Sequence, residues 1–211
     1  MTSIRTNRPW LPLSVAFFLS LGWQLAPAAA RAETAPPVKE LIATFKKVTA
    51  PAEGAKMTEA DRKANAPVYK KLDGFFAFEA FGDSCLGAAR SKLSDKQAVE
   101  YRNRLIDIMR RQGYANAGTL FKDGELKYEP VRNQDGKTVT PLKLHFAKQD
   151  IDMVIEFVWD KSNRIVDLIM DDDSLSKDFG NQIGRVLKNG GVEALGKKLA
   201  DKQAELDKEG L

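Results

Sequence analysis

Side chains that commonly catalyse reactions or bind metal ions are scarce in this sequence. It has one histidine, His145, and one cysteine, Cys85, which excludes a disulfide framework and a Cys/His zinc site. It also lacks the P-loop motif that would bind ATP and the G-x-S-x-G motif of a serine hydrolase. His145 alternates with apolar residues of a predicted strand, so we expect it on the exposed face. Neither residue is predicted to be catalytic.

Acidic residues offer two further possibilities for chemistry. Asp171, Asp172 and Asp173 form the one compact acidic cluster, but they lack the Asp-x-Asp-x-Asp-Gly spacing of a calcium loop. The favoured interpretation is a solvated turn that leads into a helix, with Asp173 or Ser174 as the helix cap. Asp167 lies within an apolar strand and could serve as the base of an isomerase-like enzyme, although the sequence identifies no partner residue for it. We predict no metal site and no cofactor.

Charge and composition exclude other classes of function. The 211 residues include 43% hydrophobic and 29% charged residues, and the mean hydropathy is -0.36, which is typical of a soluble globular protein. The formal net charge is +4, but Arg5, Arg8 and Arg31 lie in the first 32 residues, which contain no acid. The remaining 30 basic and 29 acidic side chains nearly cancel. Binding to nucleic acid is therefore not expected.

Residues 1–32 have the features of a secretory signal peptide. A basic start precedes the apolar run Leu11–Leu21, and a stretch of small residues ends in Ala30-Arg31-Ala32. A membrane anchor is the alternative, but the apolar run is too short to span about 30 Å of hydrocarbon. We expect cleavage after Ala32, a periplasmic location, and a single domain over residues 33–211.

Helical patterns dominate the first half of the mature chain. Val38, Leu41, Ile42 and Phe45 recur at helical spacing, and a short helix is predicted from near Thr58 to a break before Pro67. An aromatic helical segment follows from Phe75 to Leu86. A capping box at Ser94 and Gln97 then predicts a long helix that ends near Gly113.

The apolar period changes from about 3.6 to 2 at Glu125, which indicates strands. The alternation predicts four strands, the third over Ile151–Trp159 and the fourth over Ile165–Met170, followed by two helices that Asn189-Gly190-Gly191 separates. This order predicts an α+β fold in which a helical layer packs on a four-stranded antiparallel curved sheet, as in the cone of NTF2-like and cystatin-like proteins.

Two segments of this fold offer large apolar surfaces. The third strand carries five apolar residues on one face, and the Phe75–Leu86 helix is rich in phenylalanine. These surfaces could form an ordinary core or line an apolar cavity, and periodicity alone does not separate the two.

The order and pattern of Phe75–Leu206 resemble MlaC-type periplasmic phospholipid-binding proteins, the toluene-tolerance family. The resemblance rests on FFAFEAFGDSCLGAARSKLSDKQ with its Leu-Gly pair and Ser-x-x-Gln helix start, on KTVTPLKLHF and IDMVIEFVW, and on RIVDLIMDDDSL before GGVEALGKKLADK. The chain departs from the family pattern at three positions. Ala77 replaces an Asp, Arg90 or its neighbour a Trp, and Gly180 an Arg.

The resemblance implies a carrier without catalytic residues. Such a protein would hold phospholipid acyl chains in an apolar cavity and shuttle lipid between an outer-membrane lipoprotein/porin complex and an inner-membrane ABC transporter complex. A periplasmic adaptor with a filled core and an enzyme using Asp167 are the alternatives. The residues expected to contact lipid are Phe75, Phe78, Phe81, Leu86, Ile106, Met109, Phe146, Met153, Ile155, Phe157, Trp159, Leu168, Phe179 and Ile183.

Overall fold

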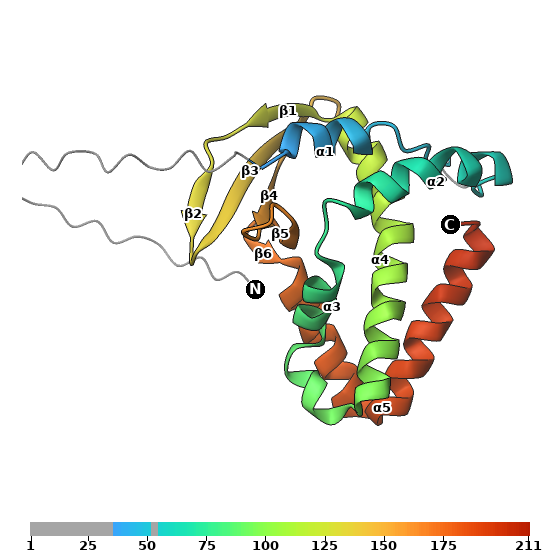
Figure 1. Ribbon diagram of the computed structural model, residues 1–211. Helices are drawn as coiled ribbons and strands as arrows, with labels where there is room; N and C mark the ends of the chain where they lie inside the picture. Colours follow the sequence, from blue (N-terminus) through green and yellow to red (C-terminus); the bar gives the residue numbers. More distant parts are fainter. Residues whose placement is uncertain (1–35, 52–54) are drawn as a thin grey trace, which may run out of the picture. The chain divides into compact units, whose positions relative to one another are not determined.

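The computed structural model describes residues 36–51 and 55–211, which belong to one unit of the chain (Figure 1). The predicted export signal and its cleavage position after Ala32 lie outside the described residues. In the part that is described, no helix has the length and apolar character needed to cross a membrane.

Five α-helices, a 3₁₀ helix and one sheet make up this unit. Their order is α1 (Val38–Phe45), α2 (Glu59–Asp73), α3 (Phe78–Leu86), the 3₁₀ helix η1 (Gly87–Lys92), α4 (Asp95–Asp123), β1 (Glu125–Tyr128), β2 (Arg132–Gln134), β3 (Lys137–Phe146), β4 (Ile151–Trp159), β5 (Ile165–Met170), β6 (Asp173–Ser174) and α5 (Leu175–Glu209).

Helices α2, α4 and α5 begin at capping residues, and α2 and α4 extend further than predicted. Capping boxes at Thr58 and Ser94 start α2 and α4. Helix α2 continues through Pro67, which is exposed, so the carbonyl that loses its partner can bond to water. Helix α4 continues ten residues past Gly113 to Asp123, because Tyr114 and Phe121 extend its buried face.

The sheet is antiparallel in the order β1-β3-β4-β5-β6, and β2 also pairs with β3. The predicted first strand is thus divided into β1 and β2 around Pro130. Pro141 of β3 lies opposite this division, and its carbonyl accepts a hydrogen bond from the backbone N–H of Glu129. The proline nitrogen, which has no hydrogen to donate, faces the same interrupted edge. The expected α+β class is confirmed, but the sheet has six strands rather than four.

Two tight turns fix the register of the β2–β3 and β5–β6 pairs. Asp135 and Gly136 connect β2 to β3, and Asp171 and Asp172 connect β5 to β6, with all four residues at positive φ. Two consecutive left-handed residues form the turn that matches strand twist, and Asp tolerates this conformation. The acidic cluster of the sequence is therefore largely a hairpin turn.

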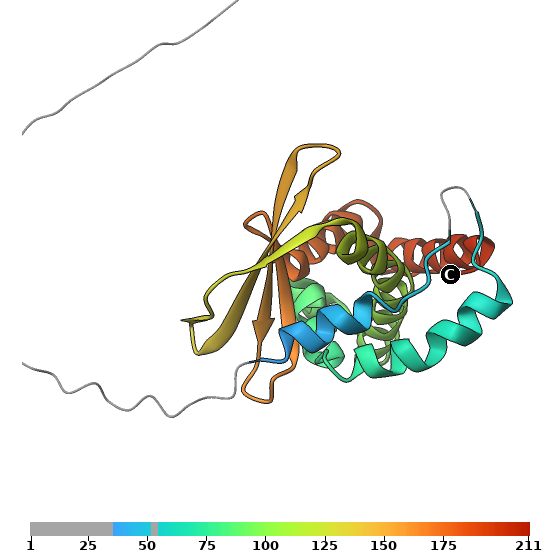
Figure 2. The ribbon, with the colours of Figure 1, turned by 90° about the horizontal axis from the view of Figure 1, so that it is seen from above.

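The helices cover one face of the sheet, as the view from above shows (Figure 2). Their packing forms two hydrophobic clusters. The first joins α1 and the second half of α4 to the sheet, with Phe45, Phe121, Phe157 and Trp159 among its members. The second joins α3, η1 and the first half of α4 to α5. The two clusters remain separate.

Candidate functional site

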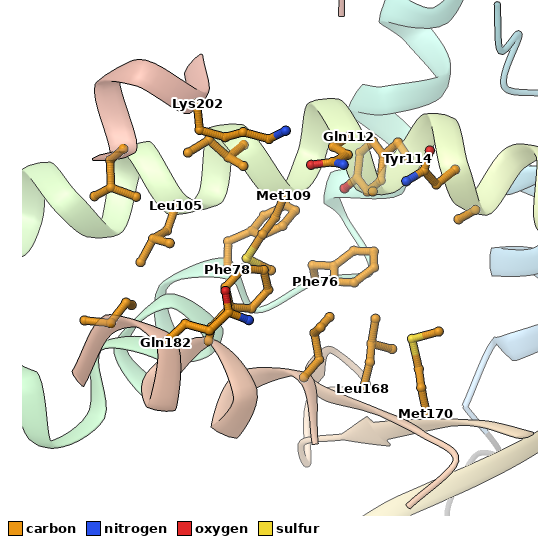
Figure 3. A pocket seen from close by; sticks show the side chains of 18 of the residues that line it. Phe76, Phe78, Leu105, Met109, Gln112, Tyr114, Leu168, Met170, Gln182 and Lys202 are labelled. Atoms are coloured by element: carbon orange, nitrogen blue, oxygen red, sulfur yellow. The ribbon is translucent and has the colours of Figure 1, made fainter. Parts of the chain in front are cut away.

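A cavity of about 710 Å³ lies between the two hydrophobic clusters (Figure 3). This volume is within the range of about 300–1,000 Å³ that is typical of ligand pockets. Its wall combines residues of α4, both halves of α5, the start of α3 and the helix-facing side of β4 and β5. The lining residues are Phe45, Phe76, Phe78, Leu105, Ile108, Met109, Gln112, Gly113, Tyr114, Asn116, Ala117, Leu120, Phe121, Ile155, Phe157, Leu168, Met170, Leu175, Phe179, Gln182, Ile183, Val186, Leu195, Lys198, Leu199 and Lys202.

Aromatic rings hold one side of the wall in place. Phe76 stacks on Phe78 with the ring centroids 5.2 Å apart, and both side chains line the cavity (Figure 3). Phe45 packs edge-on against Tyr114, with ring centroids 5.7 Å apart, and in a tilted arrangement against Phe121 at 5.4 Å. Such contacts fix side-chain positions, so this part of the wall is rigid.

A polar cluster of Tyr114, Asp73 and Arg110 supports the aromatic side of the cavity wall. The hydroxyl of Tyr114 donates a hydrogen bond to Asp73 Oδ1 at 2.9 Å, and Arg110 Nε donates to the same oxygen at 2.8 Å. Burial, followed by the charge of Asp73, raises the pKa of Tyr114 well above its usual range. The Arg110 guanidinium lies 5.9 Å from the centroid of the Phe78 ring. These contacts join the end of α2 to α4 and keep Tyr114 protonated.

Seven of the residues predicted from the sequence to contact lipid line this cavity. They come from α3, α4, β4, β5 and α5, and they are Phe78, Met109, Ile155, Phe157, Leu168, Phe179 and Ile183. The structure therefore brings together side chains that are up to 105 positions apart in the sequence.

The other seven predicted residues are not part of the cavity wall. Phe81 and Leu86 are buried in the second cluster, and Phe75 and Trp159 are buried in the first. The indole N–H of Trp159 donates to Thr140 Oγ1 at 2.8 Å, which fixes the ring inside the core. The remaining three are partly buried. Phe146 and Met153 pack on the first cluster near the far end of the hairpin, and Ile106 lies beside Gly82.

Several lining residues were not identified from the sequence. Phe45, Tyr114, Ala117, Leu120 and Phe121 form the end of the cavity near α1. Four of them belong to the part of α4 beyond Gly113, where the helix was predicted to stop. Their spacing of three and four residues continues the helical period, and this signal could have located them.

Groups with potential reactivity lie outside the wall. The Cys85 thiol is fully buried, and burial, reinforced by the charge of Asp167, raises its pKa to about 12. His145 Nδ1 lies 2.8 Å from Asp152 Oδ1 on the surface, and this contact raises the pKa of the imidazole. Neither group contacts the cavity, so neither is positioned to act on a molecule inside it.

The acidic residues have structural partners. Asp167 accepts hydrogen bonds from the backbone N–H of Leu168 and Ser176 and from the Ser174 hydroxyl, at 2.9, 3.1 and 2.7 Å. Asp171 Oδ1 accepts from the backbone N–H of Val154 at 3.0 Å. Over residues 36–51 and 55–211, no group of three His, Cys, Asp or Glu side chains could hold a metal ion.

The three positions at which the sequence departs from the family pattern also lie outside the cavity wall. Ala77 precedes α3 and donates its backbone N–H to Ile165. Arg90 forms an ion pair with Asp95, and Gly180 packs near the carbonyl of Cys85. None of these positions alters the surface of the cavity.

The geometry therefore provides an open pocket with a mostly apolar wall, and no Asp, Glu, His or Cys of the described residues lines it. Such a site can remove hydrocarbon from water.

Comparison with known proteins gave a family match and several solved structures with a similar fold. The chain matches the model of the MlaC protein family over residues 43–201. Its fold is similar to that of a phospholipid-binding protein from Ralstonia solanacearum, whose structure was solved in complex with a phospholipid. The two chains are 19% identical, with a TM-score of 0.59, and the match covers 81% of this chain and 94% of that one. A search of curated proteins found no match. The family match spans most of the chain and both sides of the cavity, and the chain belongs to the MlaC family.

Proposed function

We propose that this protein binds a phospholipid, with its acyl chains in the cavity, and acts as a carrier rather than an enzyme. The observation that carries the proposal is the cavity of about 710 Å³ with a wall that is almost entirely apolar. Membership of the MlaC family and the similarity in fold to a phospholipid-binding protein support it.

Physical chemistry gives this cavity a clear use. Each acyl methylene contributes about 0.8 kcal/mol when it leaves water, so a chain of roughly sixteen carbons that crosses an aqueous compartment unshielded costs on the order of 10 kcal/mol. A protein cavity lowers that barrier. The bilayer and the cavity are both apolar, so the net free energy of transfer is small and the direction of transport depends on the partners.

The proposal extends to the setting in which the carrier works. We place it in the periplasm after cleavage behind Ala32, where it would exchange lipid between an outer-membrane lipoprotein/porin complex and an inner-membrane ABC transporter. This exchange would maintain outer-membrane lipid asymmetry. N-terminal sequencing of protein from the periplasmic fraction should begin at Glu33, and recovery of the full-length chain would contradict export.

A cavity-filling variant tests lipid binding directly. Ala117 lies on α4 and lines the cavity, whereas Thr119, two residues further along the same helix, is exposed and does not line it. Ala117→Trp should therefore occupy the space that acyl chains need, while Thr119→Trp adds the same ring outside it.

The measurement is lipid uptake from phospholipid vesicles by delipidated protein. We expect Ala117→Trp to lose most of its uptake and Thr119→Trp to retain it, with native circular dichroism spectra for both. Equal uptake by a folded Ala117→Trp variant would show that the cavity is not the lipid site.

A further inference from the structure

Three polar residues of the cavity wall lie where the cavity opens to solvent. Asn116 on α4, Gln182 in the first half of α5 and Lys198 in its second half are exposed to solvent and line the cavity at the same time. Exposed residues that line a cavity mark its mouth. The buried part of the wall, which includes Phe157, is apolar except for the Tyr114 hydroxyl, which is bonded to Asp73. A bound amphiphile would therefore keep its tails inside and its polar head at this mouth.

Two lysines at the mouth interrupt an otherwise apolar stripe. Leu195, Lys198, Leu199 and Lys202 follow the i, i+3, i+4, i+7 spacing that places residues on one helix face, and all four line the cavity. Leu195 and Leu199 are buried. Charged residues in such a stripe break the pattern that packing favours, and breaks of this kind occur at functional sites.

The charge at the mouth has one sign. Lys198 and Lys202 line the cavity, and no Asp or Glu is among the lining residues that the structure describes. Lys202 Nζ lies 3.0 Å from Glu205 Oε1, which is outside the wall. For Lys198, no ion pair is found with any residue in 36–51 or 55–211. Lys197 provides a contrast, because it does not line the cavity and pairs with Asp201 at 2.7 Å.

The helix that carries the lysines is held at its far end. Arg111 on α4 donates to Asp207 Oδ1 at 2.6 Å and to the carbonyl oxygen of Leu211 at 2.8 Å. The backbone N–H of Met57 donates to the carbonyl of Glu209 at 3.1 Å. Lys202 is visible above the cavity in Figure 3, where α5 crosses the view near α4. The helix that carries Lys198 and Lys202 is thus anchored at its C-terminal end.

We propose that Lys198 and Lys202 bind the phosphate of the ligand's headgroup. The protein then selects lipids with an anionic headgroup over lipids that have the same acyl chains and an uncharged head. A lysine ammonium donates three hydrogen bonds and its flexible stem can pack along apolar surface, so both lysines can follow the wall and reach a phosphate at the mouth. This inference rests on the proposed function, because it concerns the polar end of the same ligand.

The test is a competition between two lipids that differ only in the headgroup. Delipidated protein is incubated with detergent micelles that contain equimolar phosphatidylglycerol and diacylglycerol with identical chains, and the bound lipids are counted by native mass spectrometry. The wild-type protein should retain phosphatidylglycerol about tenfold over diacylglycerol. In the double variant Lys198→Gln/Lys202→Gln the ratio should fall toward one through loss of phosphatidylglycerol.

A matched control removes the same charge from the same helix. Lys197 and Lys208 lie in the second half of α5, are exposed and do not line the cavity. Lys197→Gln/Lys208→Gln should leave the ratio unchanged. An equal loss in both double variants would show that net charge, rather than the site at the mouth, causes the preference, and would overturn the inference.

The remaining outcomes separate this inference from the proposed function. If the wild-type protein binds both lipids equally, the headgroup site is wrong and the carrier proposal survives. If it binds neither lipid, the proposed function itself fails. Inorganic phosphate at millimolar concentration should not displace the lipid. Displacement would identify a site for free phosphate and would contradict headgroup recognition.

Discussion

The carboxylate of Asp167 accepts hydrogen bonds from three donors at the junction of β5, β6 and α5. Two of these donors are backbone N–H groups, so the side chain completes the turn in the way that a cap completes a helix. Asp167 was a candidate base because it is an acidic residue within an apolar strand. Its structural role explains why an acid occurs at that position.

Asp167→Asn should lower the free energy of unfolding by about 1–3 kcal/mol, because the amide directs an N–H toward groups that are themselves donors. Lipid binding should stay within about threefold of the wild-type value. Urea unfolding and vesicle uptake measure the two effects, with Asp123→Asn at the exposed end of α4 as the control. Formation of lysolipid or free fatty acid by the wild-type protein, and its loss in Asp167→Asn, would instead support an enzyme.

His145 gives a pH-dependent signal that can be assigned without ambiguity, because the chain has one histidine. The hydrogen bond to Asp152 raises its pKa above 6.5. The pair therefore stabilises the fold fully below the unfolded-state pKa, and this contribution disappears as the pH rises through the folded-state pKa. An NMR titration should give a pKa above 6.5 in the wild-type protein and a lower value in Asp152→Asn. An identical pKa in both proteins would contradict the contact.

At the scale of elements, α5 is two helices joined by a single residue. Gly191 has φ 68° and ψ -167°, a conformation that is essentially restricted to glycine. It redirects the chain so that Leu195 and Leu199 meet the cavity from another side than Ile183 and Val186. The bend thereby converts one amphipathic sequence into two walls.

Gly191→Ala should therefore destabilise the protein by about 1–3 kcal/mol. Gly184 is the matched control on the same element, since it is helical and a Cβ there would meet no atom within 4 Å. Gly184→Ala should be neutral or stabilise by up to about 1 kcal/mol. Thermal unfolding of both variants tests this prediction. Equal midpoint temperatures would contradict the claim that position 191 requires glycine.

The elements also show how far the sequence determines this fold. The capping box at Ser94 correctly predicted the start of α4, the change of period at Glu125 predicted the start of the strands, and the glycines near Gly191 predicted the interruption of the last helical segment. The end of α4 was not predicted, because a glycine is a weak stop signal when buried residues such as Tyr114 and Phe121 continue the helix. The division of the first strand at Pro130 was missed as well, since it depends on pairing with β3.

At the scale of the whole molecule, the two hydrophobic clusters meet without merging, and the cavity occupies the space between them. Periodicity identifies which side chains turn inward, but it does not say whether they contact each other or an empty space. For this reason Phe81 and Trp159 looked equivalent to Phe78 and Phe157 in the sequence, although only Phe78 and Phe157 line the cavity.

Native mass spectrometry of the mature protein, purified from its host without detergent, tests the central claim most directly. We predict a complex with the mass of the polypeptide plus a diacyl phospholipid, which dissociates on unfolding and yields intact phospholipid on extraction. A polypeptide that carries no lipid, both as purified and after incubation with phospholipid vesicles, would contradict the account.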